Sequence, residues 1–391
     1  MRIRPLLALP VLVLACSGET QPEPHDSYSD ATLAEYLQAL PDQERLSANL
    51  PTAQDTPGAL TQAGNAVLAA QGIAFARAVN QPVRALVTTL RVITAFKPTF
   101  FDAGAQKFVW GPWDSEDGVG KAALYVEKNG PGADFEYSYA LLRSATADLD
   151  GATAVIAGGT TPDPEDRFRG VGVTLWDLEA NRQFDEAHDP AGSVGRGRGR
   201  FVTLFGHQTA EGGDAAFNIA VFRDFVAERE VGASMDPEAI DVDYFYGRLI
   251  STDGVRVDFV DSKILADLCD ASAESCFEND ALADADEQLD YDAFFVNRGQ
   301  GRAEARLSAG DLSSPVRVIE CWNPGLHRTS FQIGTDGANG GAMVETMENG
   351  SCAAPADQAR SALGLPTLDD VDAVLLDAMS CAAERGLSAC D

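Results

Sequence analysis

Few residues in this chain have the types and spacing that catalysis requires. Three of its four histidines, His188, His207 and His327, lie far apart, and no HExxH or HxH pair occurs. A three-histidine metal site assembled across strands is one interpretation, because zinc accepts imidazole ligands. No GxSxG, GxGxxG or GxxxxGK[ST] motif is present, so no hydrolase or nucleotide-binding signature is found. The sequence therefore favours a non-catalytic protein, with a hydrolase lacking a recognisable motif as the alternative, since triads depend on geometry.

Alternating carboxylates form the densest acidic run of the chain. Oxygen ligands at such spacing suit Ca²⁺, which takes about six to eight of them. The glycine and the terminal glutamate of an EF-hand are missing, so a solvated acidic loop is the alternative interpretation. The candidate calcium ligands are Asp284, Asp286, Asp290 and Asp292. The sequence predicts no other metal and no organic cofactor.

One basic cluster stands out, at Arg196, Arg198 and Arg200, which alternate with glycines. Arginine forks bind carboxylates and other anions through two parallel hydrogen bonds, so this cluster is a candidate ligand contact. The simpler interpretation is that these arginines pair with neighbouring carboxylates of the same chain.

Tryptophans supply the second group of candidate ligand contacts. Trp110 and Trp113 flank a Gly-Pro pair, and Trp322 follows Glu-Cys. Exposed indoles stack on sugars or line ligand clefts. The alternative is that the indoles fill the core and that one of them is half-exposed.

The net charge of the chain is −31 at pH 7, and 60 acidic residues stand against 29 basic ones. Phosphate neutralisation needs lysine and arginine, so nucleic acid is not expected as a partner. Anionic lipid surfaces would also repel the chain, so a covalent lipid would hold it at a membrane better than charge would. The charge favours neutral, cationic or metal-bearing partners, or serves only solubility.

The first residues predict an exported protein. Arg2 and Arg4 precede an apolar run from Pro5 to Ala15, which is shorter than the roughly 20 residues that span a bilayer. A positive start, a short apolar run and a small residue before the cut describe a signal peptide over residues 1–15. Residues 16–29 are rich in Pro, Glu and Ser, so we expect them to form a disordered tether.

Six cysteines follow Cys16, all in the last third of the chain. An even number of cysteines in an exported protein indicates disulfides. Short loops favour pairing of Cys269 with Cys276 and of Cys381 with Cys390, which leaves Cys321 and Cys352 as the third pair. No CxxC occurs, so zinc is a poor alternative.

The spacing of apolar residues predicts helices over residues 30–96. Asp30 could cap a helix over 32–40. A longer helical pattern runs from about Leu60 to Phe96, and Pro82 should divide it into two helices because proline lacks the N–H group.

From residue 97 to 335 the apolar period changes to two. About twelve alternating runs are separated by turn signals, which predicts an antiparallel meander. An acidic, partly helical insertion is expected at 261–289. Residues 336–391 begin with a glycine-rich loop, and a final helix over 367–386 follows, capped by Thr367. The predicted fold is α+β, a large curved antiparallel sheet of about ten to twelve strands, a meander or half-barrel packed against N- and C-terminal helices.

The segment Val13-Leu14-Ala15-Cys16 resembles the lipobox of bacterial lipoproteins. That resemblance implies acylation of Cys16, which follows the cut, and Ser17 after it implies the outer membrane of a Gram-negative cell. The body, with Phe108–Trp113 and Glu320–Trp322, resembles predicted envelope lipoproteins without known activity. Its element order is also similar to the lipoprotein-carrier half-barrel.

Three functional classes follow from these observations. The first is a non-catalytic envelope protein, anchored by its lipid with its body in the periplasm or on the cell surface, that binds a ligand or an envelope protein. The second is a carrier of a lipid or other apolar ligand, which needs an apolar cavity. The third is an enzyme, which needs converging titratable groups.

Overall fold

The computed structural model describes most of the chain from residue 27 onward. The described residues are 27–50, 65–115, 119–149, 151–163, 169–190, 197–210, 213–226, 239–266, 286–297, 299–310, 312, 314–335, 343–348 and 368.

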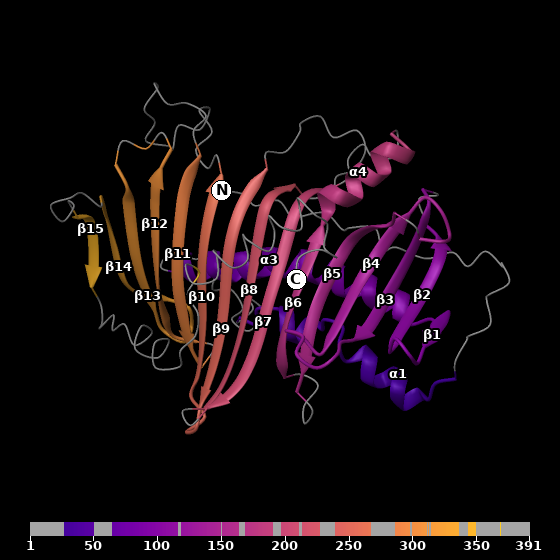
Figure 1. The fold of residues 1–391 in the computed structure, drawn as a ribbon. Coiled ribbons are helices and arrows are strands. Elements are labelled where there is room, and N and C mark those ends of the chain that lie inside the picture. The colour runs from indigo at the N-terminus through magenta and orange to yellow at the C-terminus, as the bar shows by residue number, and fades with distance from the viewer. Residues whose placement is uncertain are drawn as a thin grey trace.

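A single antiparallel sheet of 15 strands dominates the structure, with the strands in chain order (Figure 1). The predicted α+β fold with a large curved antiparallel meander is confirmed. The first eight strands are β1 (Phe100–Asp102), β2 (Lys107–Asp114), β3 (Lys121–Lys128), β4 (Tyr137–Ser144), β5 (Thr153–Pro162), β6 (Gly170–Asp177), β7 (Arg198–Ala210) and β8 (Gly213–Val226). The others are β9 (Ile240–Ser251), β10 (Arg256–Ala266), β11 (Glu287–Val296), β12 (Gly301–Ala309), β13 (Val316–Trp322), β14 (Arg328–Thr335) and β15 (Met343–Glu348).

The sheet exceeds the expected ten to twelve strands for identifiable reasons. Strand β1 has only three residues, too few for a visible alternation. Strand β15 lies in the segment expected to be a loop before the final helix. The insertion expected at 261–289 is shorter than predicted, because β10 and β11 stay paired from Val257↔Val296 to Ala266↔Glu287.

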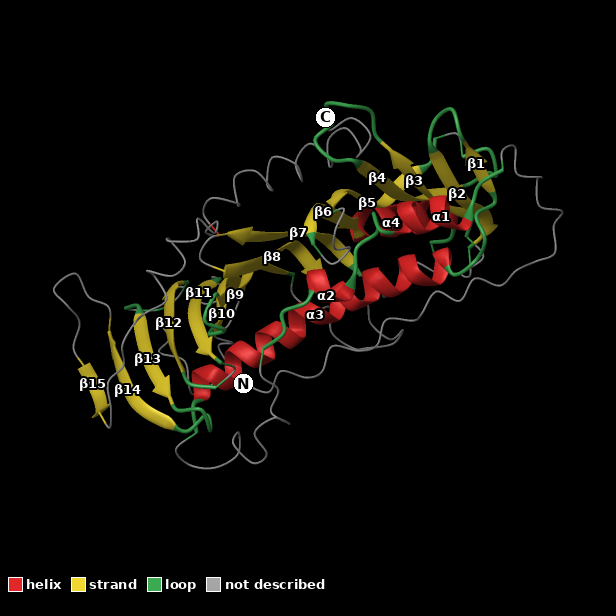
Figure 2. Ribbon diagram, turned by 90° about the horizontal axis from the view of Figure 1, so that it is seen from below, coloured by secondary structure: helices red, strands yellow, loops and turns green. Residues whose placement is uncertain are grey.

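Three helices line one face of the curved sheet, here called the inner face (Figure 2). They are α1 (Asp30–Leu37), α2 (Gln43–Leu46) and α3 (Val67–Thr94). The cap of α1 is Ser29, whose hydroxyl accepts from the Thr32 amide at 3.0 Å, rather than Asp30. α1 packs near β3, α2 near β7, and α3 across β11–β13.

The prediction that Pro82 divides the long helical pattern is wrong. α3 runs through Pro82 as one helix of 28 residues. Proline costs one backbone hydrogen bond there. The buried apolar stripe on both sides of Pro82, from Leu68 to Ile93, packs on the sheet and offsets that cost.

A fourth helix, α4 (Leu178–His188), lies inside the region expected to be all strands. It links β6 to β7, and its cap Asp177 accepts from the Ala180 amide at 2.8 Å. The buried ion pair between Arg143 and Asp185, 3.0 Å long, holds it to the sheet. The helix has few apolar residues, so no apolar helical stripe is visible in this segment.

Side chains of the inner face hold the helical layer through its main chain. The α3 cap residue, Ala66, offers no side-chain hydrogen bond. The buried carboxylate of Glu320, from β13, instead accepts from the Leu68 amide at 2.6 Å. The Tyr291 hydroxyl donates to the Leu68 carbonyl at 2.7 Å. A carboxylate at a helix N-terminus satisfies a free N–H and complements the helix dipole.

Two more contacts of this kind lie along the preceding segment. The Thr160 hydroxyl donates to the Ala39 carbonyl at 2.7 Å, and the Asn218 amide donates to the Leu46 carbonyl. At the other end of the layer, Glu35 of α1 accepts from both Lys128 and Tyr137 at 2.7 Å. The hydrogen bond from Lys128, followed by that from Tyr137, lowers the pKa of the Glu35 carboxyl.

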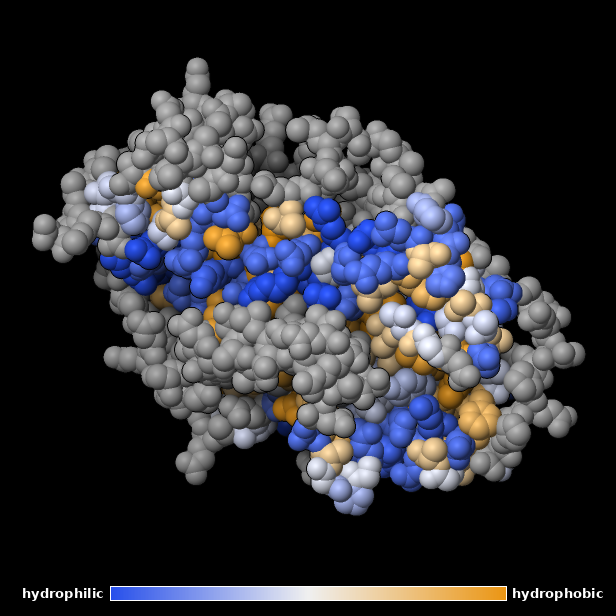
Figure 3. All heavy atoms as spheres, turned by 45° about the horizontal axis from the view of Figure 1, so that its top comes forward, coloured by the Kyte–Doolittle hydropathy of each residue, from blue (hydrophilic) through white to orange (hydrophobic). Residues whose placement is uncertain are grey.

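The outer face of the sheet carries a second apolar cluster. Its buried members include Val202, Ile219, Phe245 and Phe294, which alternate with inner-face residues along their strands. Leu368 packs against this cluster. The rest of the expected helix over 367–386 lies outside the described residues. On the face drawn in Figure 3, hydrophilic residues predominate among the residues that the structure describes.

α3 lies so close to the sheet at Gly72 that a side chain there would meet Tyr291. A Cβ atom at this position would lie 2.3 Å from the Tyr291 hydroxyl oxygen. Replacing glycine by alanine normally stabilises a helix interior by about 0.5–1 kcal/mol. We expect Gly72→Ala instead to lower the free energy of unfolding, measured by urea titration, because the two side chains cannot both fit. In a Tyr291→Phe background the penalty should shrink. A stabilised Gly72→Ala variant would contradict this packing.

Candidate functional site

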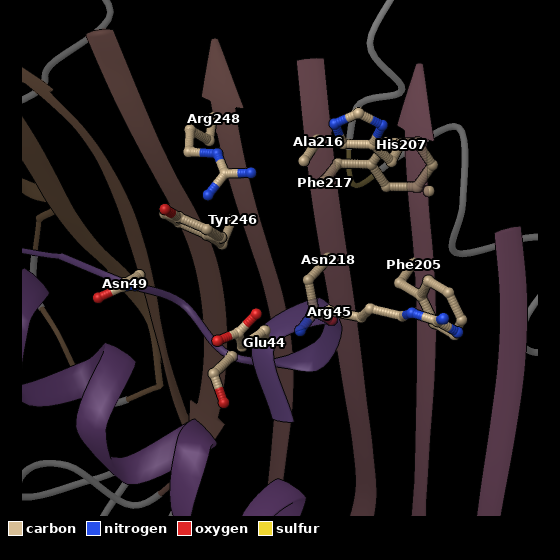
Figure 4. Close-up of a pocket in the computed structure, with 12 residues that line it drawn as sticks. Glu44, Arg45, Asn49, Phe205, His207, Ala216, Phe217, Asn218, Tyr246 and Arg248 are labelled. Atoms are coloured by element: carbon tan, nitrogen blue, oxygen red, sulfur yellow. The ribbon is translucent and has the colours of Figure 1, made fainter. Parts of the chain in front are cut away.

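A pocket opens on the inner face where α2 meets β7, β8 and β9 (Figure 4). Its free space is about 50 Å³. The short helix and the loop after it form one wall, and three adjacent strands form the other. The lining residues that carry functional groups are Glu44, Arg45, Ser47, Asn49, His207, Asn218, Tyr246 and Arg248.

Strand register brings the polar lining residues together. His207 pairs with Ala216, which pairs with Arg248 on the next strand. Asn218 pairs in the same way with Tyr246. Residues directly opposite one another in antiparallel strands share a face. The period of two therefore places His207, Asn218 and Arg248 on the inner face, although they are distant in sequence.

Cationic groups predominate in the pocket of this acidic protein. Arg248 forms no hydrogen bond or ion pair with any other described residue. The Arg45 guanidinium lies 5.7 Å from the centre of the Phe205 ring, a cation–π distance. Glu44 is the one carboxylate among the described lining residues. The local charge is thus opposite to that of the whole chain.

His207 is held in one orientation by a carboxylate. Its Nε2 lies 3.0 Å from Asp214, across the hairpin between β7 and β8. Asp214 also accepts from Thr209 at 3.3 Å and lies 3.6 Å from Arg169. The His207 side chain is only 10% exposed, and its Nδ1 has no hydrogen-bond partner.

Asn218 and Tyr246 form the floor of the pocket. Asn218 is 1% exposed, and its amide nitrogen is engaged with Leu46, while its Oδ1 has no hydrogen-bond partner. The Tyr246 hydroxyl donates to Asp258 at 2.7 Å. Burial, followed by the nearby Asp258 carboxylate, raises the pKa of Tyr246 well above its ordinary value. Tyr246 therefore stays neutral and is a fixed part of the pocket floor.

Two of the three candidate tryptophans are buried. Trp110 and Trp322 are 0% and 3% exposed, and their indole N–H groups donate to Phe96 at 3.0 Å and to Gly299 at 2.9 Å. Trp322 is thus buried, although the sequence suggested an exposed indole. Trp113 is half-buried against Phe96, with ring centres 5.9 Å apart. These positions match the alternative interpretation of the three indoles, as core residues with one partly exposed.

The structure separates the other candidates from this pocket. Arg200 pairs with Asp177 at 3.0 Å, Arg198 lies at the start of β7, and Arg196 is outside the described residues. Asp290 accepts from Gln288 at 2.8 Å, and Asp292 follows it on β11. Asp286 is exposed, and Asp284 is outside the described residues. Within the described ranges no three His, Cys, Asp or Glu side chains are grouped to hold a metal ion.

The cysteine predictions fall almost entirely outside the described residues. Cys321 is described and is 4% exposed. Cys16, Cys269, Cys276, Cys352, Cys381 and Cys390 are not described, so acylation and disulfide pairing stay predictions. Over the described helices, none has the length and apolar character needed to cross a bilayer.

Sequence reasoning considered His207 only as part of a metal site with His188 and His327. The structure places His188 in α4 and His327 beside Asn65, so the three do not form a site. The pairing of His207 with Asp214 had a local signal, because the two residues are seven positions apart across one hairpin. Arg248 had no such signal, because the other residues that line the pocket come from α2, the loop after it and the strands β7 and β8 as well as β9.

No protein-family model, curated protein or solved structure matches this chain.

Proposed function

We propose that the chain is a lipid-anchored, non-catalytic binding protein of the bacterial outer membrane, and that the pocket between α2 and β7–β9 binds an anionic group. The ligand class is inferred from Arg248. This arginine is half-buried, and its guanidinium has no partner among the described residues. In a chain with a net charge of −31, an inward arginine left unpaired is best explained by an anion from outside.

Packing of the inner face supports a binding protein over an apolar carrier. Buried side chains of α3, such as Val83, Leu86 and Leu90, join those of the strands in one continuous core. A carrier of a drug-sized or larger apolar ligand needs a cavity of about 300–1,000 Å³. The pocket has about 50 Å³ of free space and a polar lining.

The pocket does not bring a nucleophile of the described residues into hydrogen-bond contact with its histidine. Asp214 and His207 form an oriented pair, but the Nδ1 of His207 contacts no nucleophile among the described residues. Ser47 also lines the pocket, and its hydroxyl has no hydrogen-bond partner. Nucleophilic catalysis needs the nucleophile within hydrogen-bond reach of its base. This geometry supports binding rather than turnover.

Replacement of Arg248 tests the pocket. We expect D-glucuronate to bind the protein more tightly than D-glucose in calorimetric titration, because only glucuronate carries a carboxylate. Arg248→Gln should weaken glucuronate binding at least about tenfold, since hydrogen bonds to charged groups contribute about 1.5–3 kcal/mol. Arg302→Gln is the matched control, because Arg302 already pairs with Glu304 at 3.0 Å on β12. Equal binding of glucuronate and glucose would refute the anionic site.

Replacement of Cys16 tests the anchor. In a Gram-negative host grown with labelled palmitate, the wild-type protein should carry the label and fractionate with outer membranes. Cys16→Ser should lose the label, because the acyl chains attach through the Cys16 thiol in the lipoproteins that this segment resembles. Label that persists in Cys16→Ser would show that the anchor prediction is wrong.

A further inference from the structure

Besides the Ser47 hydroxyl, two atoms of the pocket that can accept a hydrogen bond have no partner. They are Oδ1 of Asn218 and Nδ1 of His207. Asn218 is 1% exposed, and the His207 side chain is 10% exposed. A buried polar atom without a partner is costly and rare in folded proteins, so a ligand that supplies donors is favoured here.

The surroundings fix the role of each atom. The amide nitrogen of Asn218 donates to the Leu46 carbonyl, so its oxygen is the atom left free. An ionised carboxylate can only accept, so the His207 Nε2 carries the hydrogen toward Asp214. In the neutral ring, Nδ1 then presents a lone pair. The oxygen of Asn218 therefore calls for a hydrogen-bond donor, and Nδ1 of His207 does so when the ring is neutral.

Arg248 calls for the opposite kind of group. Its guanidinium carries five donors and no acceptor. The pocket thus joins a site for an anionic acceptor to two sites for donors, all on neighbouring strands. A ligand that fits all three must carry both kinds of group close together.

We propose that the ligand is a hydroxylated carboxylate of the acidic-sugar class, with its carboxylate on Arg248 and a hydroxyl group donating to Asn218 or His207. This inference rests on the proposed function. A simple carboxylate or a fully ionised phosphate would leave both acceptors unpaired. An ammonium group would supply donors, but it would lie beside the cationic Arg45 and Arg248, whereas a hydroxyl carries no charge.

A matched pair of ligands separates the two claims. D-Glucuronate and cyclohexanecarboxylate share a six-membered ring and a carboxylate, but only glucuronate has hydroxyl groups. In calorimetric titration of the wild-type protein we expect glucuronate to bind about tenfold more tightly, since one or two added hydrogen bonds are worth about that factor. His207→Phe should weaken glucuronate binding and leave cyclohexanecarboxylate binding unchanged. His188→Phe, whose ring stacks on Phe184 in α4, is the control.

Each outcome bears on a different claim. If both carboxylates bind the wild-type protein equally, the hydroxyl assignment is wrong and the anionic site stands. If neither binds, the proposed function fails as well. A thermal melt checks that His207→Phe folds, and the wild-type ligand pair decides the matter without that variant.

Discussion

Hydrogen bonds between inward-facing side chains of the sheet and the main chain of the helical layer are the constraint on which the rest of the structure depends. A helix leaves its first N–H groups and last carbonyls without partners, and an irregular segment leaves more. Here the sheet supplies the partners, and each lies on a strand far from the segment that it holds. The contacts are Thr160 to Ala39, Asn218 to Leu46, Arg256 to Asn49, and Tyr291 and Glu320 to Leu68.

These contacts decide what the inner face can do. They hold α3 so close to the strands that Gly72 leaves no room for a side chain, and the interior is filled rather than open. The four-residue helix α2 forms the helical layer at β7. The pocket lies there. Asn218 both holds the helical layer and lines the pocket, because its amide nitrogen donates to the Leu46 carbonyl and its Oδ1 has no hydrogen-bond partner.

The sheet could be predicted from the sequence, and the site could not. Alternation along runs such as Phe217–Phe222 depends on neighbours two residues apart, so it is visible in the sequence. The continuity of α3 through Pro82 depends on tertiary packing that outweighs a local rule. The site depends on register between strands, which aligns Arg248 with His207 only after the meander forms. The buried Trp322 is a similar case, because its hydrogen bond to Gly299 is a contact between strands.

Native-state hydrogen exchange tests the central claim most directly. If the sheet holds α3 through Leu68 and the buried stripe, amides of α3 and of the central strands β8 and β9 should exchange only through global unfolding, with equal opening free energies. Replacing Glu320 by Gln should lower both values together. Exchange of α3 amides at a distinctly lower free energy than those of β8 and β9 would contradict the account, because the helix would then open independently of the sheet.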